Sequence, residues 1–145
     1  QKPNMHEHVA RVPLIISAPS IHPGRSSSPV ELIDFYPTCT DLFNVSNPKY
    51  IQGKSLLPIL RNPQHMIRET ALITEINGQG GSIRSKNWQY FKYTIKGGGE
   101  ELYDMTKDPE QYTNLVKNPE YEAMLKEYRS KFEARMNAVK WEWTK

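Results

Sequence analysis

Short apolar runs separated by prolines dominate the first half of the chain. Residues 12–17 (Val-Pro-Leu-Ile-Ile-Ser) form a continuous apolar run. Such a run predicts a strand buried on both faces, with Pro13 at its start or at a sheet edge. Residues 28–31 (Ser-Pro-Val-Glu) predict a helix start, with Ser28 as the cap and the glutamate completing a capping box. Pro37 is expected to end or kink that helix, and residues 38–43 then continue it on a new axis.

The second half contains short strand-like segments separated by glycine-rich turns. The most distinctive, residues 88–95 (Trp-Gln-Tyr-Phe-Lys-Tyr-Thr-Ile), is dense in aromatic and β-branched side chains. The other predicted strands are residues 71–76, 82–85 and 101–105. Because the connections between these segments are short, they predict an antiparallel meander of three or four strands.

A helical pattern occupies the end of the chain. Asn118 and Pro119 have the residue types of a helix cap and of a first helical turn. Apolar residues then recur every three or four positions, which indicates one buried helix face: Tyr121, Met124, Leu125, Tyr128, Phe132, Met136 and Val139. We predict that this helix packs across the meander. The predicted fold class is therefore α+β, an antiparallel meander with a long packed C-terminal helix, preceded by a strand and helices.

Charge and length exclude several classes of protein. The 145 residues carry a net charge of +3 without a dense basic run, so no nucleic-acid groove is predicted. No apolar stretch approaches the roughly 18 residues of a transmembrane helix. The chain opens with Gln-Lys-Pro-Asn and has neither an initiator Met nor an apolar signal core there. This opening favours a piece of a longer protein.

Few residues suggest chemistry by themselves. His6 and His8 could bind a metal from one face of a strand, although polar loop residues are the more common interpretation of such a pair. The single cysteine, Cys39, is either a thiol nucleophile or, more commonly, a buried structural residue. Residues 78–81 and 97–99 could hold an anion through backbone amides, but they lack the features of a phosphate loop and predict hairpin turns.

Three stretches carry patterns that belong together. In residues 2–16, Lys2 lies ten positions before Val12 of a Val-Pro-Leu-Ile run, with an acidic and a small residue, Glu7 and Ala10, between them. The other stretches are residues 30–38 with 53–57, and residues 83–90 with Glu101-Leu-Tyr-Asp104, Asp108-Pro109 and Thr113-Asn-Leu115. In this order they resemble the C-terminal part of the sulfatase family, in the alkaline-phosphatase-like superfamily. The similarity is strongest to the iduronate-2-sulfatase-like branch of bacterial enzymes.

The resemblance implies sulfate-ester hydrolysis with a formylglycine nucleophile beside a bound Ca²⁺. The formylglycine motif, Cys/Ser-x-Pro/Ala-x-Arg, does not occur in these 145 residues, and the family's metal ligands lie upstream of the position of Lys2. Of the catalytic residues, only Lys2 transfers to this chain. Its ammonium group would bind a sulfate oxygen and stabilise charge on the leaving group.

The resemblance also assigns a domain plan and a pocket rim. Residues 1–66 would be the tail of the α/β catalytic domain, and residues 67–145 a small subdomain of antiparallel sheet and helix. Arg84 and Gln79 would line the substrate pocket. At the position of Gly81 several relatives carry a histidine just before the strand, so this chain departs from the family there.

Two functions follow as expectations. In the first, the chain is the C-terminal fragment of a sulfatase that acts on sulfated sugars, inactive alone and periplasmic or secreted as part of its parent. In the second, it is a stand-alone module that binds sulfated glycan. A strand between Val12 and Ile16 that lacks its sheet neighbours would expose an apolar edge, which predicts dimerisation through it.

Overall fold

The computed structural model describes residues 5–74, 80–94 and 97–139. These residues form two compact units, one made of residues 13–71 and the other of residues 5–12 together with the described residues from 72 onward. The predicted domain boundary after residue 66 refers to a longer protein and stays a prediction.

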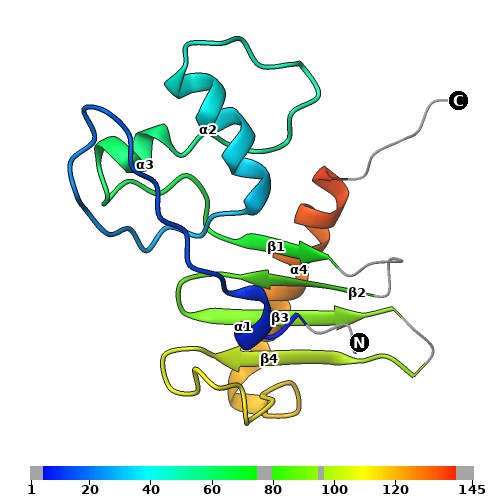
Figure 1. Ribbon diagram of the computed structural model, residues 1–145. Helices are drawn as coiled ribbons and strands as arrows, with labels where there is room; N and C mark the ends of the chain where they lie inside the picture. Colours follow the sequence, from blue (N-terminus) through cyan, green and yellow to red (C-terminus); the bar gives the residue numbers. More distant parts are fainter. Residues whose placement is uncertain (1–4, 75–79, 95–96, 140–145) are drawn as a thin grey trace, which may run out of the picture. The chain divides into compact units, whose positions relative to one another are not determined.

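A four-stranded sheet is the centre of the second unit. Its strands lie in the order of the sequence (Figure 1): β1 (Ala71–Thr74), β2 (Gly80–Arg84), β3 (Trp88–Tyr93) and β4 (Glu100–Asp104). β2 pairs with β3, and β3 with β4, in antiparallel register. The predicted meander and its α+β class are confirmed. Side chains alternate between the two faces of each strand, so this sheet has two separate apolar faces to cover.

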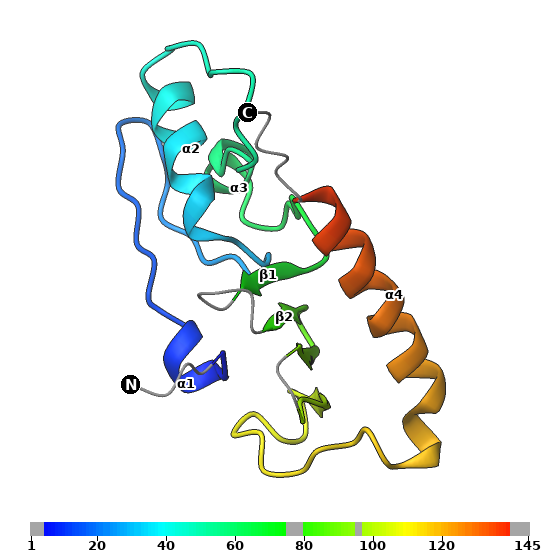
Figure 2. The ribbon, with the colours of Figure 1, turned by 90° about the vertical axis from the view of Figure 1, so that its right-hand side faces the viewer.

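The long helix α4 (Glu122–Ala138) covers one of these faces, as Figure 2 shows. It follows a short 3-10 helix, η3 (Pro119–Tyr121), at whose start the side chain of Asn118 accepts a hydrogen bond of 3.0 Å from the backbone N–H of Glu120. The predicted cap is therefore confirmed. Within the described ranges, no helix is both long and apolar enough to cross a bilayer.

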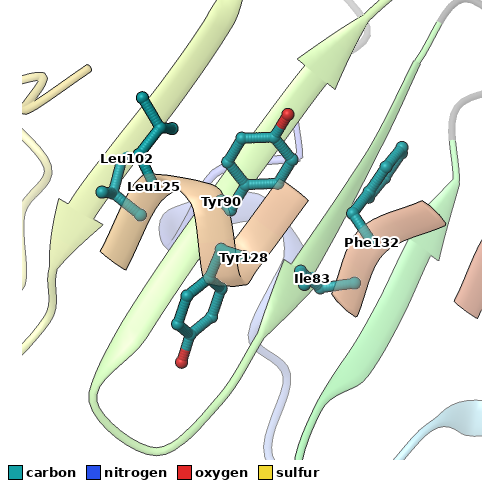
Figure 3. Packing of buried hydrophobic residues seen from close by; sticks show 6 residues of the cluster. All are labelled: Ile83, Tyr90, Leu102, Leu125, Tyr128 and Phe132. Carbon is teal, nitrogen blue, oxygen red and sulfur yellow. The ribbon is translucent and has the colours of Figure 1, made fainter. Parts of the chain in front are cut away.

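Alternate residues of the sheet meet the apolar stripe of α4. The buried side chains of this interface are Ile83, Tyr90, Leu102, Leu125, Tyr128 and Phe132 (Figure 3). Each contributes on the order of 1.5–3 kcal/mol by leaving water. The rings of Tyr90 and Phe132 meet edge to face at 5.6 Å, the geometry that aromatic pairs prefer. The predicted packing of the helix across the meander is confirmed.

Two aspartate side chains hold the loop between β4 and η3 by accepting hydrogen bonds from its backbone N–H groups. The Asp104 carboxylate accepts the backbone N–H of Thr106 at 2.9 Å. The Asp108 carboxylate accepts the N–H groups of Tyr112 and Thr113 at 3.0 and 2.8 Å. Aspartate side chains can bind backbone N–H groups that have no partner in a helix or sheet, so these two aspartates shape the loop. In this chain they are structural residues.

Residues 13–71 fold around three short helices: η1 (Leu32–Asp34), α2 (Phe35–Leu42) and α3 (Leu57–Arg61). The predicted helix start at Ser28 is wrong, because the capping box is made by Glu31 and Asp34, one turn later. Pro37 neither ends nor breaks α2. It is the third residue of the helix, where its missing N–H has no partner to lose.

Asp34 is the polar centre of this unit and is fully buried. Its carboxylate forms a bidentate ion pair with Arg68 and accepts the backbone N–H of Lys54 at 2.8 Å. Gly53 is required beside it, because a Cβ there would collide with the carbonyl oxygen of Ile33. Burial alone would raise the pKa of Asp34, but the hydrogen bonds from Arg68 and from backbone N–H groups outweigh it and lower the pKa.

The predicted strand at residues 12–17 is wrong, since these residues are not part of any sheet in the described structure. A strand needs a neighbouring backbone to complete its ladder. Without one, the apolar run remains extended and exposed, with 69% of Val12 and 91% of Ile15 accessible to solvent. Dimerisation through this segment stays a prediction.

Replacing Asp34 by Asn should lower the free energy of unfolding by about 3–5 kcal/mol, because Arg68 would stay buried without its bidentate partner, with only the Glu31 carboxylate left at 3.9 Å. In the unchanged chain, this stabilisation is complete above the ordinary aspartate pKa of 3.8 and is lost as the pH falls through the lowered pKa. Urea unfolding between pH 2 and 7 measures both effects. Asp41→Asn, on the exposed side of α2, is the control. Equal effects of the two substitutions would contradict the assignment.

Candidate functional site

The N-terminal segment covers the sheet face opposite α4. It contains the short helix α1 (Glu7–Ala10), which lies on the other side of the sheet from α4 in Figures 1 and 2. Met5 is 2% exposed and packs with Phe91, Tyr103 and Met105, which form the second apolar core. The segment that follows Lys2 in the sequence is therefore held against the sheet.

Two buried glutamines connect this segment to the sheet by hydrogen bonds. The amide nitrogen of Gln89, in β3, donates to the carbonyl oxygen of Met5 at 3.2 Å and to Ser82 Oγ at 3.1 Å. Gln111 donates to the amide oxygen of Gln89 at 3.0 Å and accepts the backbone N–H of Glu7 at 2.8 Å. Every donor and acceptor of the Gln89 amide is therefore used, as burial requires.

Gln111 has an unusual backbone conformation. Its φ of +62° lies in the left-handed region, which costs a residue other than glycine about 1–2 kcal/mol. The surrounding structure maintains this conformation, because the backbone N–H of Gln111 donates to the carbonyl of Asp108 at 3.2 Å and both ends of its side chain are bound. Strained residues of this kind cluster at functional sites, so Gln111 is a candidate for a functional role.

Charged side chains surround the same segment. The Glu7 carboxylate accepts Arg84 Nε at 3.0 Å and lies 3.6 Å from Arg11 Nη1. His6 stacks on Phe91 with ring centroids 4.6 Å apart, and its Nε2 lies 3.1 Å from a carboxylate oxygen of Glu101. The segment is thus held by apolar, polar and ionic contacts together.

The structure places one of the three predicted site residues. Arg84, at the end of β2, donates to the Glu7 carboxylate and to the carbonyl of Ser85, so it helps to hold the N-terminal segment. Its contact with substrate stays a prediction. Lys2 and Gln79 lie outside the described residues.

No metal site emerges from the described residues. In that part of the chain no three His, Cys, Asp or Glu side chains gather closely enough to hold an ion. The segment after His6 is a helical turn instead of a strand, and its histidines neighbour aromatic and acidic side chains. These described residues therefore do not fit a Ca²⁺ site.

Gly81 is a packing position. It lies within β2, not before it as predicted, and on the face toward α4. A Cβ there would lie 3.0 Å from Phe132 Cε2 and 3.2 Å from the carbonyl oxygen of Ile73. A side chain at this position would point into the main core, away from the N-terminal segment.

Sequence reasoning missed Gln89 and Gln111. Their partners, Met5 and Glu7, are 84 and 104 residues away in the sequence, so no local periodicity marks the contacts. One signal was present: Gln89 is polar within a run of aromatic residues that predicts a buried strand. A buried amide in such a run needs hydrogen-bond partners, so the sequence indicates that some exist but not which residues they are.

Comparison with known proteins identifies the family. The family model described as "N-sulphoglucosamine sulphohydrolase, C-terminal" matches residues 1–138. The chain therefore belongs to the sulfatase family, within its C-terminal region.

Individual relatives agree with this assignment. The chain is 31% identical over 140 residues to a Delta 4,5-hexuronate-2-O-sulfatase of Bacteroides thetaiotaomicron, covering 88% of this chain and 28% of the relative. It is 32% identical to a choline-sulfatase of Rhizobium meliloti, covering 81% and 24%. A solved structure of a 2-O GAG sulfatase superposes with a TM-score of 0.62 at 31% identity, covering 72% and 24%. The chain thus spans about a quarter of the length of these relatives.

Replacing Gly81 by His should destabilise the chain by about 1–3 kcal/mol, because the added side chain would force Phe132 and α4 to move. The matched control is Gly99→His, where nothing lies within 4 Å of an added Cβ, with an expected change below about 0.5 kcal/mol. Thermal unfolding measures both variants. Equal stability of the two would show that position 81 is not a packing site.

Proposed function

We propose that this chain forms the C-terminal region of a sulfatase that hydrolyses sulfate esters, with Lys2 in the active site. Membership of the family and the relatives' sulfatase activities support the reaction class. The printed sequence contains no Cys/Ser-x-Pro/Ala-x-Arg motif. We therefore place the formylglycine nucleophile, and the Ca²⁺ beside it, in the part of the enzyme that precedes Lys2.

One observation supports the role of Lys2 most directly. The residues that follow it, from Met5 to Arg11, are fixed on a rigid sheet by a buried side chain, hydrogen bonds and an ion pair. Fixing these residues costs conformational entropy, which supports a functional role for the segment that follows Lys2. A lysine supplies the compact positive charge that the proposed role requires.

The chemistry of Lys2 follows from that charge. Its ammonium group would donate hydrogen bonds to a sulfate oxygen of the bound ester and so orient the group. As the ester bond breaks, negative charge grows on the leaving oxygen, and a cation placed beforehand stabilises it without reorganisation. Lys2 would thus bind substrate and lower the barrier to its hydrolysis.

We propose a sulfated sugar as the substrate. The hexuronate-2-O-sulfatase and the 2-O GAG sulfatase support a carbohydrate sulfate. The choline-sulfatase is 32% identical to this chain, about as similar as the carbohydrate sulfatases. The sequence of this region therefore does not by itself determine which sulfate ester is the substrate. The expectation of a periplasmic or secreted parent enzyme agrees with a carbohydrate substrate.

The purified 145-residue chain should not hydrolyse 4-nitrophenyl sulfate, because no formylglycine can form from its sequence. Release of 4-nitrophenol, followed by absorbance, measures this. The complete enzyme under the same conditions is the positive control. Turnover by the chain alone that disappears in a Lys2→Ala variant would contradict the proposal.

In the complete enzyme, Lys2→Ala should lower kcat/KM by about a hundredfold, the loss expected for one charge-stabilising group. Lys2→Arg should retain part of the activity, since the charge remains and its geometry changes. Steady-state kinetics on a sulfated substrate measure both variants. Lys117→Ala, an exposed lysine before η3, is the matched control. Unchanged kcat/KM in the Lys2→Ala enzyme would contradict the assigned role.

A further inference from the structure

We propose that Gln111, supported by Gln89, is a positioning residue that fixes residues 5–7, the segment that follows Lys2 in the sequence. The proposal rests on the proposed function of Lys2 and goes beyond it. It assigns a role in turnover to two buried glutamines that lie on the sheet and the loop after it.

Gln111 caps the start of α1. A helix of four residues is too short to be stable alone, and its first backbone N–H groups have no partners within the helix. His6, the residue at its cap position, makes no side-chain capping bond. Gln111 accepts the N–H of Glu7 instead, at 2.8 Å, and so caps α1 from a distant part of the chain.

The two glutamines also fix the register of the N-terminal segment on the sheet. Packing of Met5 against Phe91 and Tyr103 holds the segment on the sheet but permits it to slide, since apolar contacts are not directional. Hydrogen bonds fix its register. Gln89 binds the carbonyl of Met5, and Gln111 binds the next turn at Glu7.

Gln111 is itself held in place. It is 8% exposed, its backbone is left-handed, and its amide nitrogen donates to Gln89. Gln89 is fully buried in β3 and is oriented by Ser82 of β2. Gln89 and Gln111 therefore link the N-terminal segment to the sheet and restrict its motion. Neither glutamine needs to contact substrate for this role.

The anchoring can be measured in the 145-residue chain, independently of catalysis. Gln111→Met keeps the length of the side chain and removes its hydrogen bonds. Amide hydrogen exchange should then be at least tenfold faster at Glu7, while amides in α4 keep their protection. Gln64→Met, the same substitution at an exposed glutamine, should change neither. Unchanged protection of Glu7 in the Gln111→Met chain would overturn the proposal.

The link to turnover needs a double-mutant cycle in the complete enzyme. Gln111→Met should lower kcat on the order of ten- to hundredfold by displacing Lys2, with a smaller effect on KM. In a Lys2→Ala background the same substitution should cost less than about twofold, because the group it positions is gone. An equal loss in both backgrounds would overturn the inference and leave the role of Lys2 intact. A Lys2→Ala enzyme with full activity would overturn both.

A second variant covers the case in which Gln111→Met does not fold. Gln111→Gly removes the same hydrogen bonds but relieves the left-handed backbone, so it should be the more stable of the two. It should show the same loss of kcat and the same dependence on Lys2. Full activity of a folded Gln111→Gly enzyme would overturn the proposal.

Discussion

The arrangement of this chain depends on one constraint: a sheet with two apolar faces must have both of them covered. α4 covers the face formed by Ile83, Tyr90 and Leu102. The opposite face, with Phe91 and Tyr103, is covered by Met5 and the short helix that follows it. Met5, which is distant in sequence from the sheet, thereby becomes part of the core. The place of Met5 and α1, which follow the proposed catalytic lysine in the sequence, results from the need to bury that second face.

The elements whose signals are local could be predicted from the sequence. The strands follow from β-branched and aromatic runs between glycines, and α4 follows from its apolar period and its Asn118 cap, because a single face of each element determines those patterns. The start of the first helix in residues 13–71 could not be predicted. Ser28 and Glu31 have the residue types of a capping box, but burial of Asp34 against Arg68 moves the box to Glu31 and Asp34. A long-range ion pair overrides a local preference there.

The candidate site could be predicted only in part. Lys2 is predicted from the resemblance alone, since a single lysine carries no physical signal of a catalytic role in the sequence. Gln89 and Gln111 became visible only when the fold brought their distant partners to them. Several residues of the recognised motifs have structural roles. Asp34 and Gly53 organise one unit. Asp104 and Asp108 shape a loop of the other unit. Patterns that identify this family therefore report its scaffold as much as its chemistry.

The distance in sequence between the two parts of the sheet unit has a consequence for folding. Residues 72–138 can form the meander and α4 from neighbouring segments, whereas Met5 and Glu7 must find partners 84 and 104 residues away. Closing a loop of that length costs entropy before any contact is gained, so we expect the N-terminal segment to dock late. We therefore expect the meander and α4 to form before residues 5–7 are fixed on the sheet.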